Sequence, residues 1–125
     1  MIEKHKKQYG VWMDSHHATV VGREHIDNGN FMVLAHIKNS GTHGNSNESS
    51  LHHEQIALMH KFFKEIASKM QNIDEIHVTG TGPAKEQFIH YLKETPQYKH
   101  AAASDSTNNK MTDEHLVEFF AKRYH

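Results

Sequence analysis

The chain has 125 residues, with 14 lysines and arginines against 15 aspartates and glutamates, so its formal net charge is −1. A strongly basic composition would by itself indicate nucleic-acid binding, and this chain does not have one. The absence of cysteine excludes disulfide bonds and thiolate zinc sites. No apolar run approaches the ~20 residues that cross a bilayer, and the basic start of the sequence lacks the apolar core of a secretory signal. We therefore expect a cytoplasmic protein with no membrane contact, folded as one domain over residues 1–125, with residues 1–8 flexible.

Three β-strands are predicted in the first 37 residues. In residues 9–13 the side chains of Tyr9, Val11 and Met13 alternate onto one face, and residues 18–22 are rich in β-branched side chains. The Asp-Ser-His-His sequence of residues 14–17 predicts a turn between the two strands. The Asp-Asn-Gly-Asn sequence of residues 27–30 predicts a second turn, which leads into a strand over 31–37. This strand is expected to be covered on two sides, because both of its faces are apolar. One face is expected to carry Phe31, Val33, Ala35 and Ile37, and the other Met32 and Leu34.

The composition changes at residues 38–50, which read KNSGTHGNSNESS. This segment has no apolar anchor, so it predicts a mobile loop, and a long loop inside a small domain is often functional. A helix is predicted over residues 51–71. Its core-facing residues recur at three- and four-residue spacing, and they are Ile56, Met59, Phe63, Ile66 and Met70.

The second half of the chain alternates strands and helices. Strands are predicted over 75–79 and 100–103, and helices over 84–94 and 112–123. Gly80-Thr81-Gly82-Pro83 provides the turn before the first of these helices, where proline suits the first helical position. The whole order is βββαβαβα with a mixed five-stranded sheet, which is the order of a ribonuclease-H-like three-layer α/β fold.

From Tyr9 to Tyr124 the sequence resembles the middle domain of the archaeal and eukaryotic peptide-chain release factors and of the Pelota ribosome-rescue proteins. The YGVWMD sequence of residues 9–14 is similar to the opening strand of that family, and the THGNSNES sequence of residues 42–49 lies where the family carries an exposed loop. The most specific match is IHVTGTGPAKEQF at residues 76–88, which is similar to the family's strand, glycine-rich turn and following helix.

One departure from the family pattern changes the expected function. In release factors the exposed loop carries Gly-Gly-Gln, which positions water for ester hydrolysis, whereas this chain has Gly44-Asn45-Ser46-Asn47 in its place. Pelota proteins also lack the hydrolytic motif. The resemblance therefore implies a non-catalytic RNA-binding protein that contacts ribosomal RNA, tRNA or the ribosome and uses no cofactor.

Two segments provide the predicted RNA contacts. Polar side chains of the 38–50 loop suit nucleotide recognition, although the same composition suits a solvated linker. The turn at residues 80–85 places a helix N-terminus after glycines, which suits phosphate, although such a turn is also common as a purely structural element. The predicted RNA-binding residues are Lys38, Thr42, His43, Asn45, Ser46, Asn47, Gly80, Gly82 and Lys85.

Two other functions remain open from the sequence. A metal-dependent hydrolase or nuclease needs several acids around metal ions, and Asp14 and Glu54 are the candidate catalytic acids. Imidazoles could complete such a site if the loop folds back onto the first hairpin, and the candidate ligands are His16, His17, His43, His52 and His53. The other alternative is a protein–protein adaptor that docks a partner on a sheet edge or on the terminal helix.

Overall fold

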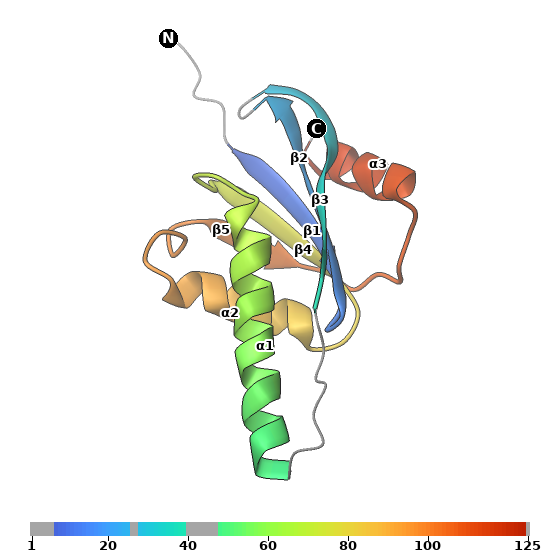
Figure 1. The fold of residues 1–125 in the computed structure, drawn as a ribbon. Helices are drawn as coiled ribbons and strands as arrows, with labels where there is room; N and C mark the ends of the chain where they lie inside the picture. The colour runs from blue at the N-terminus through green and yellow to red at the C-terminus, as the bar shows by residue number, and fades with distance from the viewer. Residues whose placement is uncertain (1–6, 26–27, 40–47, 125) are drawn as a thin grey trace.

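The structure is a computed structural model that describes residues 7–25, 28–39 and 48–124 (Figure 1). In these ranges the elements are, in chain order, β1 (Gln8–Met13), β2 (His17–His25), β3 (Asn28–Lys38), α1 (Glu48–Ser68), β4 (Glu75–Gly80), α2 (Ala84–Glu94), β5 (Ala102–Asp105) and α3 (Asp113–Arg123). The βββαβαβα order and the α/β class predicted from the sequence are confirmed. No helix in these ranges is long and apolar enough to cross a membrane.

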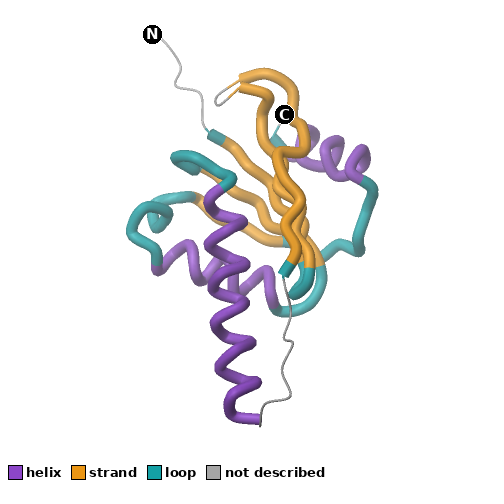
Figure 2. The backbone as a smooth tube through the Cα atoms, viewed as in Figure 1, coloured by secondary structure: helices purple, strands orange, loops and turns teal. Residues whose placement is uncertain are grey.

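The five strands form one mixed sheet in the order β3-β2-β1-β4-β5. β1 pairs antiparallel with β2, and β2 pairs antiparallel with β3. β4 lies parallel to β1 and to β5. The helices α1 and α2 lie on one face of the sheet and α3 lies on the other, which gives the three layers expected of a ribonuclease-H-like fold (Figures 1 and 2).

The alternation of side chains along β1 divides the core into two clusters. Tyr9, Val11 and Met13 pack in the larger cluster, which includes residues of α1 and α2. Trp12 points to the opposite face and packs with Leu116 and Phe120 of α3 in the smaller cluster. The predicted inward face of residues 9–13 is therefore confirmed, and the tryptophan between them anchors the terminal helix.

A β-bulge in β3 makes one sequence prediction wrong. Val20 pairs with Ala35 whereas the next residue, Val21, pairs with Val33, so Leu34 is an extra residue in β3. Upstream of the bulge, the side chains of residues 31 and 33 pack in the α3 cluster, and downstream those of residues 35 and 37 pack in the α1–α2 cluster. Residues 31, 33, 35 and 37 therefore do not share one face. Met32 and Leu34 are 45% and 37% exposed, so β3 is not covered on both sides along its length.

Several element boundaries differ from those predicted. β2 extends three residues beyond 22, and α1 begins at Glu48 and ends at Ser68 instead of spanning 51–71. The end of α1 tightens into three-residue hydrogen bonds, and Asn72, four residues beyond the helix, adopts a left-handed conformation with φ 48°. β5 spans 102–105 instead of 100–103, because residue 101 still belongs to a turn closed by a hydrogen bond to the Tyr98 carbonyl.

The predicted core stripe of α1 is confirmed in its second half. Phe63, Ile66 and Met70 are buried and Met59 is partly buried against the same cluster. Ile56 is 46% exposed, so the prediction that it faces the core is wrong. Figure 1 shows that the first turns of α1 extend beyond the sheet and have no strand beneath them.

Candidate functional site

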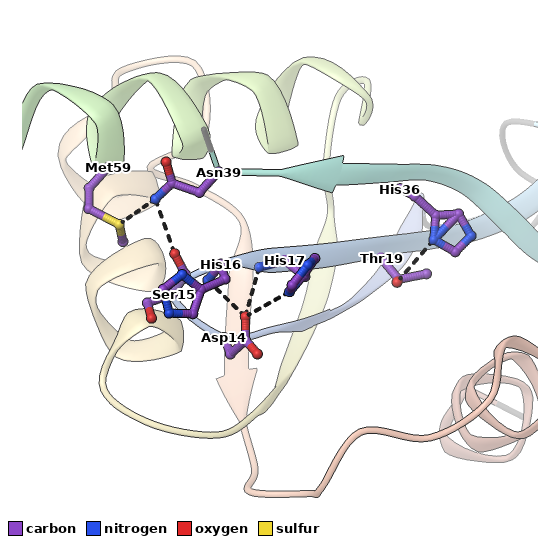
Figure 3. Close-up of polar contacts among 8 residues, drawn as sticks. All are labelled: Asp14, Ser15, His16, His17, Thr19, His36, Asn39 and Met59. Atoms are coloured by element: carbon purple, nitrogen blue, oxygen red, sulfur yellow. Dashed lines mark hydrogen bonds and ion pairs between the residues drawn. The ribbon is translucent and has the colours of Figure 1, made fainter. Parts of the chain in front are cut away.

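The turn between β1 and β2 is held by the side chain of Asp14 (Figure 3). Its Oδ1 accepts hydrogen bonds from the backbone N–H groups of His16 at 2.8 Å and of His17 at 2.7 Å, and the Nδ1 of His17 lies 3.8 Å from the same oxygen. The backbone N–H of Asp14 donates to the His17 carbonyl at 3.0 Å. This is the local bonding by which aspartate favours turns. The candidate catalytic acid Asp14 therefore has a structural task in this turn.

Asn39, the residue before the 40–47 segment, is bound to the same turn (Figure 3). Its backbone N–H donates to the His16 carbonyl at 2.8 Å, and its Nδ2 donates to the Ser15 carbonyl at 3.0 Å. The same Nδ2 lies 3.2 Å from the Sδ of Met59 on α1. These contacts fix the first end of the predicted loop between the first hairpin and α1.

A cleft of about 240 Å³ lies beside this region, between the ends of the first three strands and the start of α3. Its floor is apolar and is formed by Trp12, Ala18, Ile37, Met111 and Leu116. Its polar lining consists of His17, Thr19, His36, Lys38, Lys110 and Asp113. The fold thus brings the predicted RNA contact Lys38 together with Lys110, which lies 72 residues later in the chain.

The charge of this cleft is positive. Lys38 and Lys110 are exposed, and Asp113 is the one carboxylate among the lining residues, so the formal charge of the lining is +1 with its histidines counted as neutral. The Nε2 of His36 lies 2.9 Å from the Asp113 carboxylate. Such a cleft suits an anion with an apolar part, because the lysines attract negative charge and the floor offers apolar surface.

The start of α3 holds two of these residues in place. The Oγ1 of Thr112 accepts a hydrogen bond from the backbone N–H of His115 at 3.2 Å, which caps the helix. Lys110 and Asp113 flank this cap. The sequence predicted this helix start, but it did not predict that Lys110 and Asp113 line a cleft. The lysine shortly before the helix start was the only local sign of a charged site there.

The glycine turn after β4 has a clear structural role. Gly80 has φ 144°, and a Cβ there would lie 1.8 Å from the Met13 carbonyl oxygen. Gly82 has φ 74°, with open space around it. Both conformations favour glycine. Lys85 is 5% exposed, with its Nζ 3.8 Å from the Glu86 carboxylate, so its charge is not displayed on the surface. The phosphate contact at this turn stays a prediction.

The described part of the chain contains no arrangement of side chains that would form the predicted metal site. No group of three or more histidines, aspartates or glutamates is placed there to hold a metal ion. The rings of His16 and His17 lie 6.4 Å apart at an angle of 63°. The structure does not describe the side chains of the other residues predicted to bind RNA or metal or to act as a catalytic acid. These residues are Thr42, His43, Asn45, Ser46, Asn47, His52, His53 and Glu54.

A buried polar chain between β4 and β5 was missed from the sequence. His77 is 1% exposed, with its Nδ1 2.8 Å from the Ser104 Oγ and its Nε2 2.8 Å from the Ser106 Oγ. Burial, followed by the charge of Arg123, lowers the pKa of His77 from 6.5 to about 4, and the Asp105 carboxylate opposes this shift.

The chain of hydrogen bonds continues beyond the histidine. The Ser106 hydroxyl donates to Thr79 Oγ1 at 2.9 Å, and Asn108 Nδ2 donates to the same oxygen at 2.8 Å. The signal in the sequence was the alternation in β4, where residues 76 and 78 are apolar while 77 and 79 are polar.

No protein-family model matches this chain, and no curated protein matches it. Among solved structures, Pelota from Archaeoglobus fulgidus has a TM-score of 0.61 at 16% identity, over 96% of this chain and 32% of that chain. An archaeal translation termination factor has a TM-score of 0.56 at 12% identity, over 94% and 38% respectively. An archaeal Pelota in a ribosome-bound assembly has a TM-score of 0.55 at 22% identity, over 92% and 31%.

These likenesses extend over most of this chain but over only about a third of each larger protein. The identities are low, so what is shared is the fold. The strand order is β3-β2-β1-β4-β5, with helices on both faces of the sheet, and this arrangement agrees with the structural matches. The chain has the fold of a domain found in the Pelota and release-factor proteins.

Proposed function

We propose that the chain is a non-catalytic RNA-binding protein that associates with the ribosome or tRNA through the cleft between β1–β3 and α3. The observation that carries the proposal is that Lys38, at the end of β3, and Lys110, just before α3, both line this cleft. Support from the fold comes from its likeness to an archaeal Pelota that is bound to the ribosome. The sequence supports a non-catalytic role, because Gly-Gly-Gln is absent from it.

The lining of the cleft suits a nucleic acid more than an isolated anion. Ammonium groups bind backbone phosphates without regard to sequence, and the histidine rings and the apolar floor offer contacts to sugars and bases. The RNA contacts predicted within residues 40–47 lie outside the described residues and stay predictions, and Asn39, which precedes them, is bound to the β1–β2 turn.

The test is a titration of labelled RNA with the untagged protein at several salt concentrations. The double variant Lys38→Glu and Lys110→Glu should weaken binding. The negative slope of log K against log salt should become shallower, by about 0.7 to 0.9 for each phosphate that the protein no longer binds. The matched control is Lys64→Glu with Lys93→Glu, which makes the same charge change at exposed lysines outside the cleft. Equal weakening in the two double variants would contradict the proposed surface.

Salt dependence also separates this function from that of a protein adaptor. Phosphate contacts weaken steeply as salt rises, because bound cations are released from the nucleic acid. A partner held by apolar contacts would keep its affinity over the same range. Binding of RNA that does not change with salt would therefore contradict a phosphate contact in the cleft.

A further inference from the structure

One tautomer of His77 is compatible with every hydrogen bond around it. If the Thr79 hydroxyl donates to the Ser106 carbonyl at 3.3 Å, the Ser106 hydroxyl provides the proton of its 2.9 Å bond to Thr79 Oγ1. A serine hydroxyl has one proton. The proton between Ser106 and His77 therefore belongs to Nε2 of the imidazole, which donates to the Ser106 Oγ at 2.8 Å.

This tautomer leaves the lone pair of Nδ1 to accept the hydroxyl proton of Ser104 at 2.8 Å. Arg123 approaches the same serine from the other side, with its Nη2 donating to the Ser104 Oγ at 3.1 Å. One neighbour thus accepts the proton of the hydroxyl, and the other stabilises negative charge on the oxygen. A nucleophile, a base and a group that orients the base form the arrangement on which serine nucleophiles depend.

Ser104 differs from the rest of this polar chain in its accessibility. His77 is buried, whereas Ser104 lies exposed on the edge strand β5. It lines a cavity of about 280 Å³, whose other residues are Glu75, Ile76, Ala102, Arg123 and Tyr124. A buried histidine that is only structural needs two hydrogen-bond partners of any kind. Here one partner belongs to an exposed serine that lines a cavity.

We propose that Ser104 is a nucleophilic serine that is acylated by activated carboxylic esters, with His77 as the proton acceptor. The Ser104 Oγ attacks the carbonyl carbon of the ester while its proton moves to His77 Nδ1. The bond from the carbonyl carbon to the leaving oxygen then breaks, and the leaving group takes up the proton from Nδ1. The products are an ester on Ser104 and a free alcohol or phenol, and no oxidant or reductant takes part.

The environment of His77 limits the reaction to esters with good leaving groups. The protonated imidazole is disfavoured by burial and by the charge of Arg123, so the intermediate that holds the proton is short-lived. An ester of an acidic phenol depends least on that proton, because its phenolate is a stable leaving group and the proton on Nδ1 can then pass to solvent instead of to the leaving oxygen. This reactivity is independent of the proposed RNA contact, because the cavity at Ser104 shares no lining residue with the cleft at Lys38.

The experiment exposes the untagged protein to p-nitrophenyl acetate and locates the acetyl groups by peptide mass spectrometry over time. Ser68 is the internal control, because it is also exposed but its hydroxyl donates to the Glu65 carbonyl and not to an imidazole. We expect Ser104 to be acetylated faster than Ser68, by less than the roughly 100-fold of a well-matched general base, because the low pKa of His77 makes its imidazole a weak base. His77→Gln, which offers a donor and an acceptor but no base, should remove this advantage.

Two results would overturn the proposal. Equal acetylation of Ser104 and Ser68 in the wild-type protein would do so without any variant, so the test does not depend on how His77→Gln folds. Preferential acetylation of Ser104 that persists in a His77→Gln protein with an unchanged circular dichroism spectrum would show that the imidazole takes no part. The RNA titration of the same samples provides a separate readout for the proposed function.

Discussion

The ring of Phe120 lies directly against the backbone of Gly10, so that a Cβ at residue 10 would meet three ring carbons at 2.4 to 2.5 Å. Phe120 is fully buried in the smaller core cluster with Trp12 and Leu116. The terminal helix is therefore seated on the sheet through contact between an aromatic ring and a strand that lacks a side chain at that point.

Gly10→Ala should destabilise the protein by about 1–3 kcal/mol, because the added methyl group overpacks this contact. Urea unfolding followed by circular dichroism measures the destabilisation. Phe120→Leu is the matched second change, since a smaller side chain leaves room for the methyl group. The double variant should be destabilised by less than the sum of the single variants. Strict additivity would show that the ring does not oppose the new methyl group.

His77 should make the stability depend on pH. Its pKa is about 4 in the folded protein and near 6.5 when unfolded. Between these values the unfolded chain binds more protons, so stability falls as the pH decreases from 6.5 to 4. The contribution of His77 over this interval is about 3 kcal/mol, at 1.36 kcal/mol for each pH unit.

The difference in unfolding free energy between wild type and His77→Gln, measured at pH 7 and pH 4.5, isolates this contribution from those of the other titrating groups. The glutamine keeps a donor and an acceptor but does not titrate. Stability curves that run parallel for the two proteins would contradict a depressed pKa at His77.

Asp14 gives a test that separates a turn residue from a catalytic acid. Asp14→Ala removes the acceptor of two backbone N–H groups and should cost about 1–2 kcal/mol. Asp14→Asn keeps an oxygen acceptor and should recover most of this stability, and it should leave RNA binding unchanged. A nuclease activity present in the wild type and absent from the folded Asp14→Asn protein would instead support the metal-dependent enzyme.

Much of the fold followed from the sequence because its signals are local. The alternation at Tyr9, Val11 and Met13 and the helical spacing at Phe63, Ile66 and Met70 each reflect burial on one face. The bulge at Leu34 could not be predicted in the same way, since it depends on which residues of β2 pair with β3. The exposure of Ile56 likewise depends on how far α1 extends past the sheet.

The candidate site was less predictable than the fold. Lys38 and Lys110 are brought together only by the docking of α3 on the sheet, and nothing in their local sequence indicates this. The partners of His77 are 27 and 29 residues away, on the next parallel strand and just beyond it. Parallel pairing of β4 with β5 places them, so the polar chain becomes visible only in three dimensions.

Thr112 provides a test of how α3 is positioned at the cleft. Thr112→Ala should cost about 1 kcal/mol because it removes the helix cap, whereas Thr112→Ser keeps the hydroxyl and should be nearly neutral. Thermal unfolding measures the difference. RNA affinity should fall in the alanine variant, because Lys110 and Asp113 flank the loosened end of the helix. Equal melting temperatures for the two variants would show that the cap contributes nothing.

The most direct test of a ribosome contact through the cleft is co-sedimentation of the untagged protein with ribosomes from its own host, at low and at moderate salt. We expect pelleting at low salt that decreases at moderate salt. Pelleting should fall strongly for the Lys38→Glu and Lys110→Glu double variant and little for the Lys64→Glu and Lys93→Glu control. Absence of pelleting at both salt concentrations, or equal pelleting of the two double variants, would contradict the contact.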